Sequence, residues 1–120
     1  MNPDDCTPLG NAICVHLAEE IRKLGFPEEN LSPFPVYDQA AFTQSKDVYS
    51  GQDSLIGTWK NGKGYRVGEI KLNGDGSFYA EFDVALPHPT NARWFVEAVI
   101  AWGRDDIIKA EAKLLPAFGL

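Results

Sequence analysis

The stretch SFYAEFDV at residues 77–84 alternates apolar and polar side chains without a break, and it decides the fold class. Strict alternation with a period of two predicts a strand that has one buried face and one exposed face. The preceding NGDG at residues 73–76 is a strong hairpin signal, because asparagine and glycine readily adopt the left-handed conformation of tight turns. Residues 77–84 are therefore expected to form one strand of an antiparallel sheet.

Further strands are expected on both sides of this one. Residues 55–60 and 65–72 precede it, and Gly68 interrupts the alternation of the second segment, where a β-bulge is expected. Residues 93–102 and 107–115 follow it after short turns. Short alternating segments separated by turns predict an antiparallel β-meander, here of five strands within residues 54–115.

A helix is expected before the sheet, over residues 7–25. Apolar side chains recur there at spacings of three and four and form one stripe, made of Leu9, Ile13, Leu17, Ile21 and Leu24. Residues 26–53 are rich in Pro, Ser, Asp and Gln, so they are expected to form an irregular cover segment. The fold class is thus α+β, with one domain over residues 1–120, an N-terminal amphipathic helix packed on a five-stranded meander.

Small side chains are expected on the helix-facing side of the middle strands. The alternation assigns Ala80, Ala98, Ala110 and Ala112 to that side, with Trp94 and Trp102 among the large residues around them. Small residues surrounded by large ones leave a trough that must be filled, because protein interiors are closely packed. The helix stripe is the favoured filling, and a small apolar ligand is the alternative.

Charge and cysteine content exclude several functions. The chain has 11 Lys and Arg against 17 Asp and Glu, a net charge of −6, which disfavours binding to nucleic acid or to an anionic membrane. No apolar run resembles a secretory signal or a transmembrane span. The two cysteines are expected to be reduced thiols, with Cys14 buried in the helix and Cys6 exposed, so a cytoplasmic location is expected.

The most suggestive polar residue is His88, which lies in the loop LPHPTN at residues 86–91. Asp83 and Arg93 flank this loop, and a histidine oriented by an aspartate can act as an acid or base. The alternative is an exposed loop histidine beside an ordinary cross-strand ion pair. Asp83, His88, Arg93 and Trp94 are therefore the candidate ligand-binding residues, at the rim of the alanine trough.

No catalytic residue, metal site or cofactor is expected. Cys14 and His16 are two residues apart on a helix, so their side chains point in different directions and cannot share one ion. The chain lacks a Gly-x-Ser-x-Gly nucleophile motif and a phosphate-binding loop. The sequence favours a protein without enzymatic activity.

An apolar patch is expected on the other face of the sheet, where Phe95, Val99 and Ile107 break the polar pattern. The intrachain cover, formed by residues 34–42, is favoured slightly over a second copy of the chain paired about a two-fold axis. The leading hypothesis for function is a protein-interaction or accessory domain with a protein partner or as a homodimer. The alternative is a small-ligand binder or enzyme that uses the alanine trough.

Overall fold

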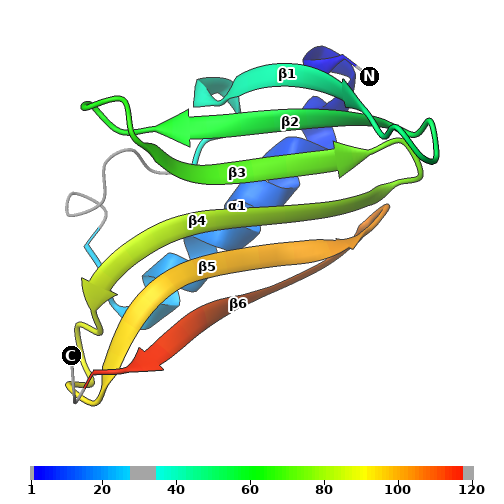
Figure 1. Ribbon diagram of the computed structural model, residues 1–120. Helices are drawn as coiled ribbons and strands as arrows, with labels where there is room; N and C mark the ends of the chain where they lie inside the picture. The colour runs from blue at the N-terminus through cyan, green and yellow to red at the C-terminus, as the bar shows by residue number, and fades with distance from the viewer. Residues whose placement is uncertain (1, 28–34, 118–120) are drawn as a thin grey trace.

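The computed structural model describes residues 2–27 and 35–117, and it shows one helix packed on one face of an antiparallel sheet (Figure 1). The sheet follows chain order, and its described strands are β1 (Ala41–Lys46), β2 (Asp53–Lys60), β3 (Arg66–Asn73), β4 (Ser77–Pro87), β5 (Trp94–Arg104) and β6 (Ile107–Pro116). The expected α+β class is confirmed. The described sheet has six strands rather than the expected five, because residues 41–46 also form a strand.

The helix α1 (Thr7–Leu24) follows a 3₁₀ turn at Pro3–Cys6 and ends at Gly25. Gly25 has a φ of 98°, a left-handed conformation that glycine adopts without a steric penalty, and its N–H donates to the Arg22 carbonyl at 3.0 Å. Ile13, Leu17 and Ile21 are completely buried. The predicted stripe therefore forms the contact between α1 and the sheet.

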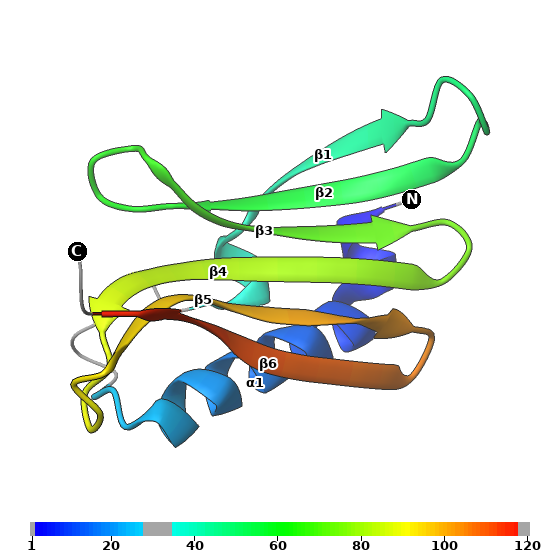
Figure 2. The same cartoon turned by 60° about the horizontal axis from the view of Figure 1, so that its bottom comes forward.

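The stripe of α1 fills the predicted trough. α1 packs against β4, β5 and β6, and Figure 2 shows it running beneath these strands. Ala80 pairs with Ala101 across β4 and β5, and Ala101 pairs with Ala110 across β5 and β6. These alanines pack in or against the same hydrophobic cluster as Ile13, Leu17 and Ile21. The small side chains of the sheet thus allow the helix to approach closely.

The predicted inner face of β5 is wrong beyond Val96, because a bulge lies between Val96 and Ala98. One extra residue in a strand moves every later side chain to the opposite face. Val99 and Ala101 consequently face α1, within the hydrophobic cluster. Ala98, Ile100 and Trp102 occupy the other face, although they were expected beside the helix.

Two smaller irregularities lie in β3 and β4. The pairings of Trp59 with Gly68 and of Lys60 with Arg66 leave Val67 as an extra residue, next to the expected bulge at Gly68. In β4 the pairing shifts between Asp83 and Leu86. Ala85 lies in this second irregularity with a φ of 52°, which is uncommon for a residue with a side chain.

The described part of the predicted cover segment lies on the helix side of the sheet. A 3₁₀ turn at Tyr37–Gln39 leads into β1, and the ring of Phe42 lies over Gly57 of β2. The Trp59 indole N–H donates to the Val36 carbonyl at 2.8 Å, which fixes this segment against β2. The expected cover of the opposite sheet face is therefore wrong for residues 35–42, while residue 34 lies outside the described residues.

Within the part of the chain that the structure describes, no helix combines the length and apolarity needed to cross a bilayer.

Candidate functional site

Hydrogen bonds between its own residues close the loop that carries His88. The His88 backbone N–H donates to the Trp94 carbonyl at 3.0 Å, and the Thr90 N–H donates to His88 Nδ1 at 3.1 Å. Nδ1 therefore acts as an acceptor, which places the ring proton of a neutral imidazole on Nε2. The imidazole serves to shape the loop.

The structure does not assemble the predicted acid–base pair. Asp83 lies on the sheet before the β4 irregularity and pairs with Ala98, whereas Arg93 lies exposed in the loop, where its N–H donates to Asn91 Oδ1 at 3.1 Å. Among the described residues, no hydrogen bond or ion pair joins His88 to Asp83 or to Arg93. Trp94 is 37% exposed at the start of β5, opposite Pro116. No described side-chain contact therefore links these four residues to one another.

The predicted patch of Phe95, Val99 and Ile107 is also not formed. Val99 is completely buried against α1 because of the β5 bulge. Phe95 is half-buried between Pro87 and Leu115, and Ile107 is 64% exposed beside the β5–β6 turn. The placement of Val99 on the outer face is thus wrong, and the three side chains do not share one surface.

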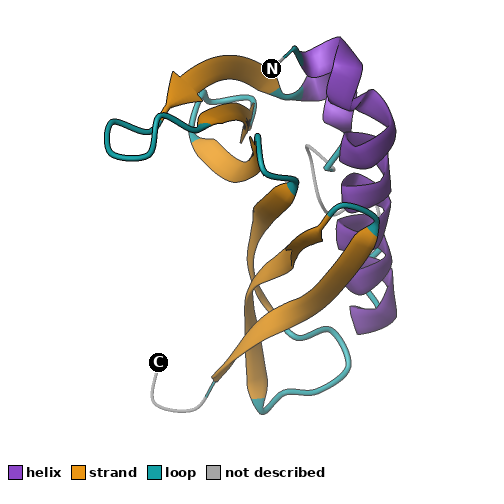
Figure 3. Cartoon of the chain, turned by 90° about the vertical axis from the view of Figure 1, so that its right-hand side faces the viewer, coloured by secondary structure: helices purple, strands orange, loops and turns teal. Residues whose placement is uncertain are grey.

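A different set of apolar side chains occupies the face opposite α1, which we call the outer face. Tyr79 of β4 pairs with Trp102 of β5, and Ile100 lies two residues before Trp102. Tyr79 is 40% exposed, Trp102 is half-buried and Ile100 is 8% exposed. We call Tyr79, Ile100 and Trp102 the outer stripe. In Figures 1 and 3, α1 lies on the other side of the sheet, and no described helix or strand lies over the outer face of β4 and β5. Within the outer stripe Tyr79 and Trp102 are the accessible side chains, whereas Ile100 is buried.

Charged side chains border the outer stripe. Glu81 pairs with Ile100, and Lys113 of β6 reaches Glu81 with Nζ 3.5 Å from Oε1. Burial, Glu81 and Glu97 raise the pKa of Asp83, against the opposing charges of Arg66 and Lys113. The Asp83 carboxylate is thus partly desolvated in an acidic environment, and the nearby positive charges do not fully compensate its negative charge.

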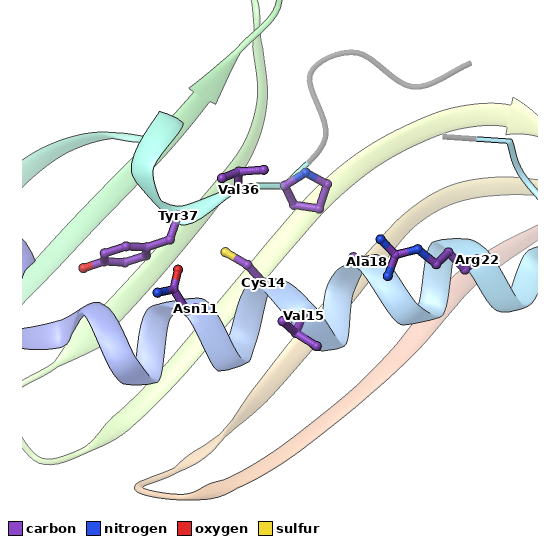
Figure 4. Close-up of a pocket in the computed structure, with 8 residues that line it drawn as sticks. Asn11, Cys14, Val15, Ala18, Arg22, Val36 and Tyr37 are labelled. Atoms are coloured by element: carbon purple, nitrogen blue, oxygen red, sulfur yellow. The ribbon is translucent and has the colours of Figure 1, made fainter. Parts of the chain in front are cut away.

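A separate pocket of about 220 Å³ lies between α1 and residues 35–37 (Figure 4). Its walls are mainly apolar, and Asn11 and Arg22 contribute polar groups. Burial, and to a lesser extent Asp38, raise the pKa of the Cys14 thiol in this pocket to about 12. At neutral pH the thiol is therefore protonated, so it is a poor nucleophile and a poor metal ligand.

The described residues hold no cluster of three or more His, Cys, Asp and Glu side chains that could bind a metal ion. Cys6 and Cys14 are both free thiols. Cys14 is buried as expected, while Cys6 is half-buried rather than fully exposed. Burial and the charge of Asp5 raise the pKa of Cys6 as well. Both thiols thus have a raised pKa, whereas reactive cysteines have a lowered one.

The chain matches no protein-family model, curated protein or solved structure with which it was compared.

Proposed function

We propose that this chain is a non-enzymatic protein-binding domain, and that its outer stripe contacts the partner. The observation that carries the proposal is the position of Trp102 and Tyr79, two large aromatic side chains that pair on a sheet face without a described covering element. Tyrosine and tryptophan contribute much of the binding energy at protein interfaces, because each buries a large area at a small entropic cost.

The helix-filled trough weakens the main alternative. A ligand in the alanine trough would have to displace Ile13, Leu17 and Ile21, which are completely buried there. Native interiors contain few voids of ligand size. The outer face requires no such rearrangement, because an antiparallel sheet commonly has one face packed on the core and the other exposed to solvent.

The charges around the outer stripe indicate the chemistry of the partner. The chain has a net charge of −6, and Glu81, Asp83 and Glu97 lie close enough together to raise the pKa of Asp83. A partner with an apolar centre and lysine or arginine at its rim would contact the stripe and compensate these carboxylates. Two free thiols are consistent with a reducing compartment, and the proposal therefore includes a cytoplasmic location.

A photo-crosslinking experiment tests this proposal in native cells. A benzophenone amino acid replaces Trp102 in one version of the protein and Val48, an exposed β1–β2 loop residue, in another. We expect one partner, identified by mass spectrometry, to crosslink at position 102 and not at position 48. Trp102→Glu should abolish co-purification of this partner, and the matched Val48→Glu should preserve it. Retained binding by a folded Trp102→Glu variant would refute the proposal.

A second candidate function is binding of a small molecule in the Cys14 pocket. The volume of about 220 Å³ is below the roughly 300–1,000 Å³ of typical ligand sites, so only a fragment-sized molecule would fit. Native mass spectrometry of freshly purified protein would detect such a ligand. An unliganded mass for every preparation would count against this second candidate.

A further inference from the structure

The strand β6 is an open edge of the described sheet. The sheet order ends at β6, and no described strand lies beyond it (Figure 1). β6 has ten residues, whereas β1 at the opposite edge has six. A long edge strand presents unpaired backbone N–H and C=O groups that can pair with another strand.

Positive and negative side chains alternate along β6, and this order suits antiparallel pairing with β6 of a second copy of the chain. Lys109, Glu111 and Lys113 alternate along the outer face of the strand, and Ala110 and Ala112 lie between them on the helix side. Lys113 already contacts Glu81 within the chain. Lys109 and Glu111 are exposed, and the described residues offer neither of them an ion-pair partner within 4.0 Å. These two opposite charges are thus available to a second chain.

We propose that two copies of this chain form a dimer through antiparallel pairing of their β6 strands, about a two-fold axis at Ala110. In this register Ala110 lies opposite Ala110 of the second copy. Lys109 lies opposite Glu111 of the second copy, and the symmetry repeats this pair. Opposite charges directly across an antiparallel pair are stabilising, whereas like charges are destabilising.

Charge order selects this register over its neighbours. An axis at Glu111 would place two Glu111 carboxylates opposite each other and each Lys109 opposite a Lys113. An axis at Ala112 would pair Glu111 with Lys113, which Glu81 already contacts, and would leave Lys109 opposite Leu115. Only the Ala110 axis, among these three, gives both unpaired charges a new partner.

The dimer extends the surface of the domain without covering it. Because the axis is perpendicular to the sheet, both copies of α1 lie on one face and both outer stripes lie on the other. Lys109 pairs with Trp102 across β5 and β6, so each interface charge lies next to an outer stripe. Dimerisation goes beyond the protein-binding function proposed above, and either can fail without the other.

Charge reversal and mixing test the dimer. Sedimentation velocity at micromolar concentration should show a dimer for the wild type. Lys109→Glu places carboxylates opposite each other at two positions, and Glu111→Lys places ammonium groups there. Each variant should weaken dimerisation by about tenfold or more. An equimolar mixture of the two variants should recover a heterodimer, because each reversed charge then faces its opposite.

The matched control is Lys60→Glu, which reverses an exposed charge in β2 and should leave the dimer unchanged. Circular dichroism confirms that each variant is folded. A monomeric wild type throughout the concentration range would overturn the proposal. A Lys109→Glu variant that remains a dimer, or a mixture that stays monomeric, would overturn the Ala110 register.

Discussion

Gly10 of α1 lies directly against the aromatic ring of Tyr37, so closely that a Cβ atom at position 10 would overlap the ring carbons. The Tyr37 hydroxyl donates to the Pro3 carbonyl at 2.7 Å, and its ring also contacts Phe42, with 4.8 Å between the ring centroids. Tyr37 thereby joins the start of α1 to the segment that leads into β1. The absence of a side chain at position 10 makes this contact possible.

Gly10→Ala should therefore destabilise the protein, although alanine normally stabilises a helix by about 1 kcal/mol relative to glycine. The overlap with Tyr37 requires the ring or the helix to move, and overpacking of this kind costs about 1–3 kcal/mol. We expect the overlap to outweigh the helix preference, with a net loss of up to about 2 kcal/mol in the free energy of unfolding, measured by urea denaturation.

A double-mutant cycle isolates the contact. In a Tyr37→Ala background the ring is gone, so Gly10→Ala should become neutral or stabilising. An equal destabilisation in both backgrounds would mean that the loss at position 10 has another cause.

The contact between α1 and the sheet predicts the effect of enlarging Ala101. Ala101 is completely buried between Ala80 and Ala110, beneath the stripe of α1. Ala101→Leu should lower the free energy of unfolding by about 1–3 kcal/mol, because no space remains for three more carbon atoms. The matched control is Ala41→Leu on exposed β1, which should change stability by less than about 0.5 kcal/mol. A neutral result at Ala101 would show that the trough is not filled by the helix.

Cys14 should make the protein less stable at alkaline pH. Its thiol has a pKa of about 12 in the folded state against an ordinary value of 9.0. Its stabilising contribution is fully present below pH 9.0 and is lost as the pH rises towards 12, because the unfolded chain releases the proton first. The pKa of Tyr37, raised mainly by burial from 10.0 to about 12, acts in the same direction.

Urea denaturation between about pH 8 and about pH 11 measures this effect, whose slope is at most about 1.4 kcal/mol per pH unit for one group. Cys14→Ala should show a shallower decline than the wild type over the same range. Parallel curves for the two proteins would contradict a raised thiol pKa.

The parts of the fold that the sequence predicted are those in which one strong local pattern is sufficient. The stripe of Ile13, Leu17 and Ile21 identifies a helix without reference to any other segment. The alternation of residues 77–84 does the same for a strand. β1 has no such pattern, because Phe42 is the only large apolar residue in AFTQSK. The ring of Phe42 packs over Gly57 of β2, where a glycine gives no apolar side chain that would reveal the contact.

The candidate site was harder to predict, because the bulge in β5 is invisible to hydrophobic patterning. From Val96 to Ala101 every residue except Glu97 is apolar. The sequence pattern therefore does not distinguish which of these side chains face the helix and which face the opposite side. The bulge appears only in the strand pairings: Val96 and Ala98 lie opposite the adjacent residues Leu114 and Lys113 of β6, and the pairing with β4 is irregular at the same place. Because of this one extra residue in β5, Ile100 and Trp102 lie on the outer face, and Val99 lies on the helix side.

Asp83 provides a test of the outer face by titration. Burial is the largest cause of its raised pKa, followed by the charge of Glu81, and Glu97 adds to the shift. A carboxyl with a raised folded pKa contributes stability that is fully present below its unfolded value of 3.8 and is lost as the pH rises through the folded pKa. At neutral pH the ionised Asp83 is thus a source of instability.

Asp83→Asn should accordingly raise the free energy of unfolding at pH 7, and the gain should shrink as the pH approaches 3. Urea denaturation across this range measures the difference, and a loss of stability at pH 7 would contradict the acidic environment. Glu97→Gln removes one of the like charges, so the pKa of Asp83, followed by the NMR shift of its side-chain carboxyl carbon, should fall towards its ordinary value. A basic partner bound to the outer stripe should shift that pKa in the same direction, because its cations stabilise the carboxylate. This shared direction connects the electrostatics of the free domain to the proposed interface. A partner that binds at Trp102 but leaves the Asp83 titration unchanged would carry no cation to this part of the outer face.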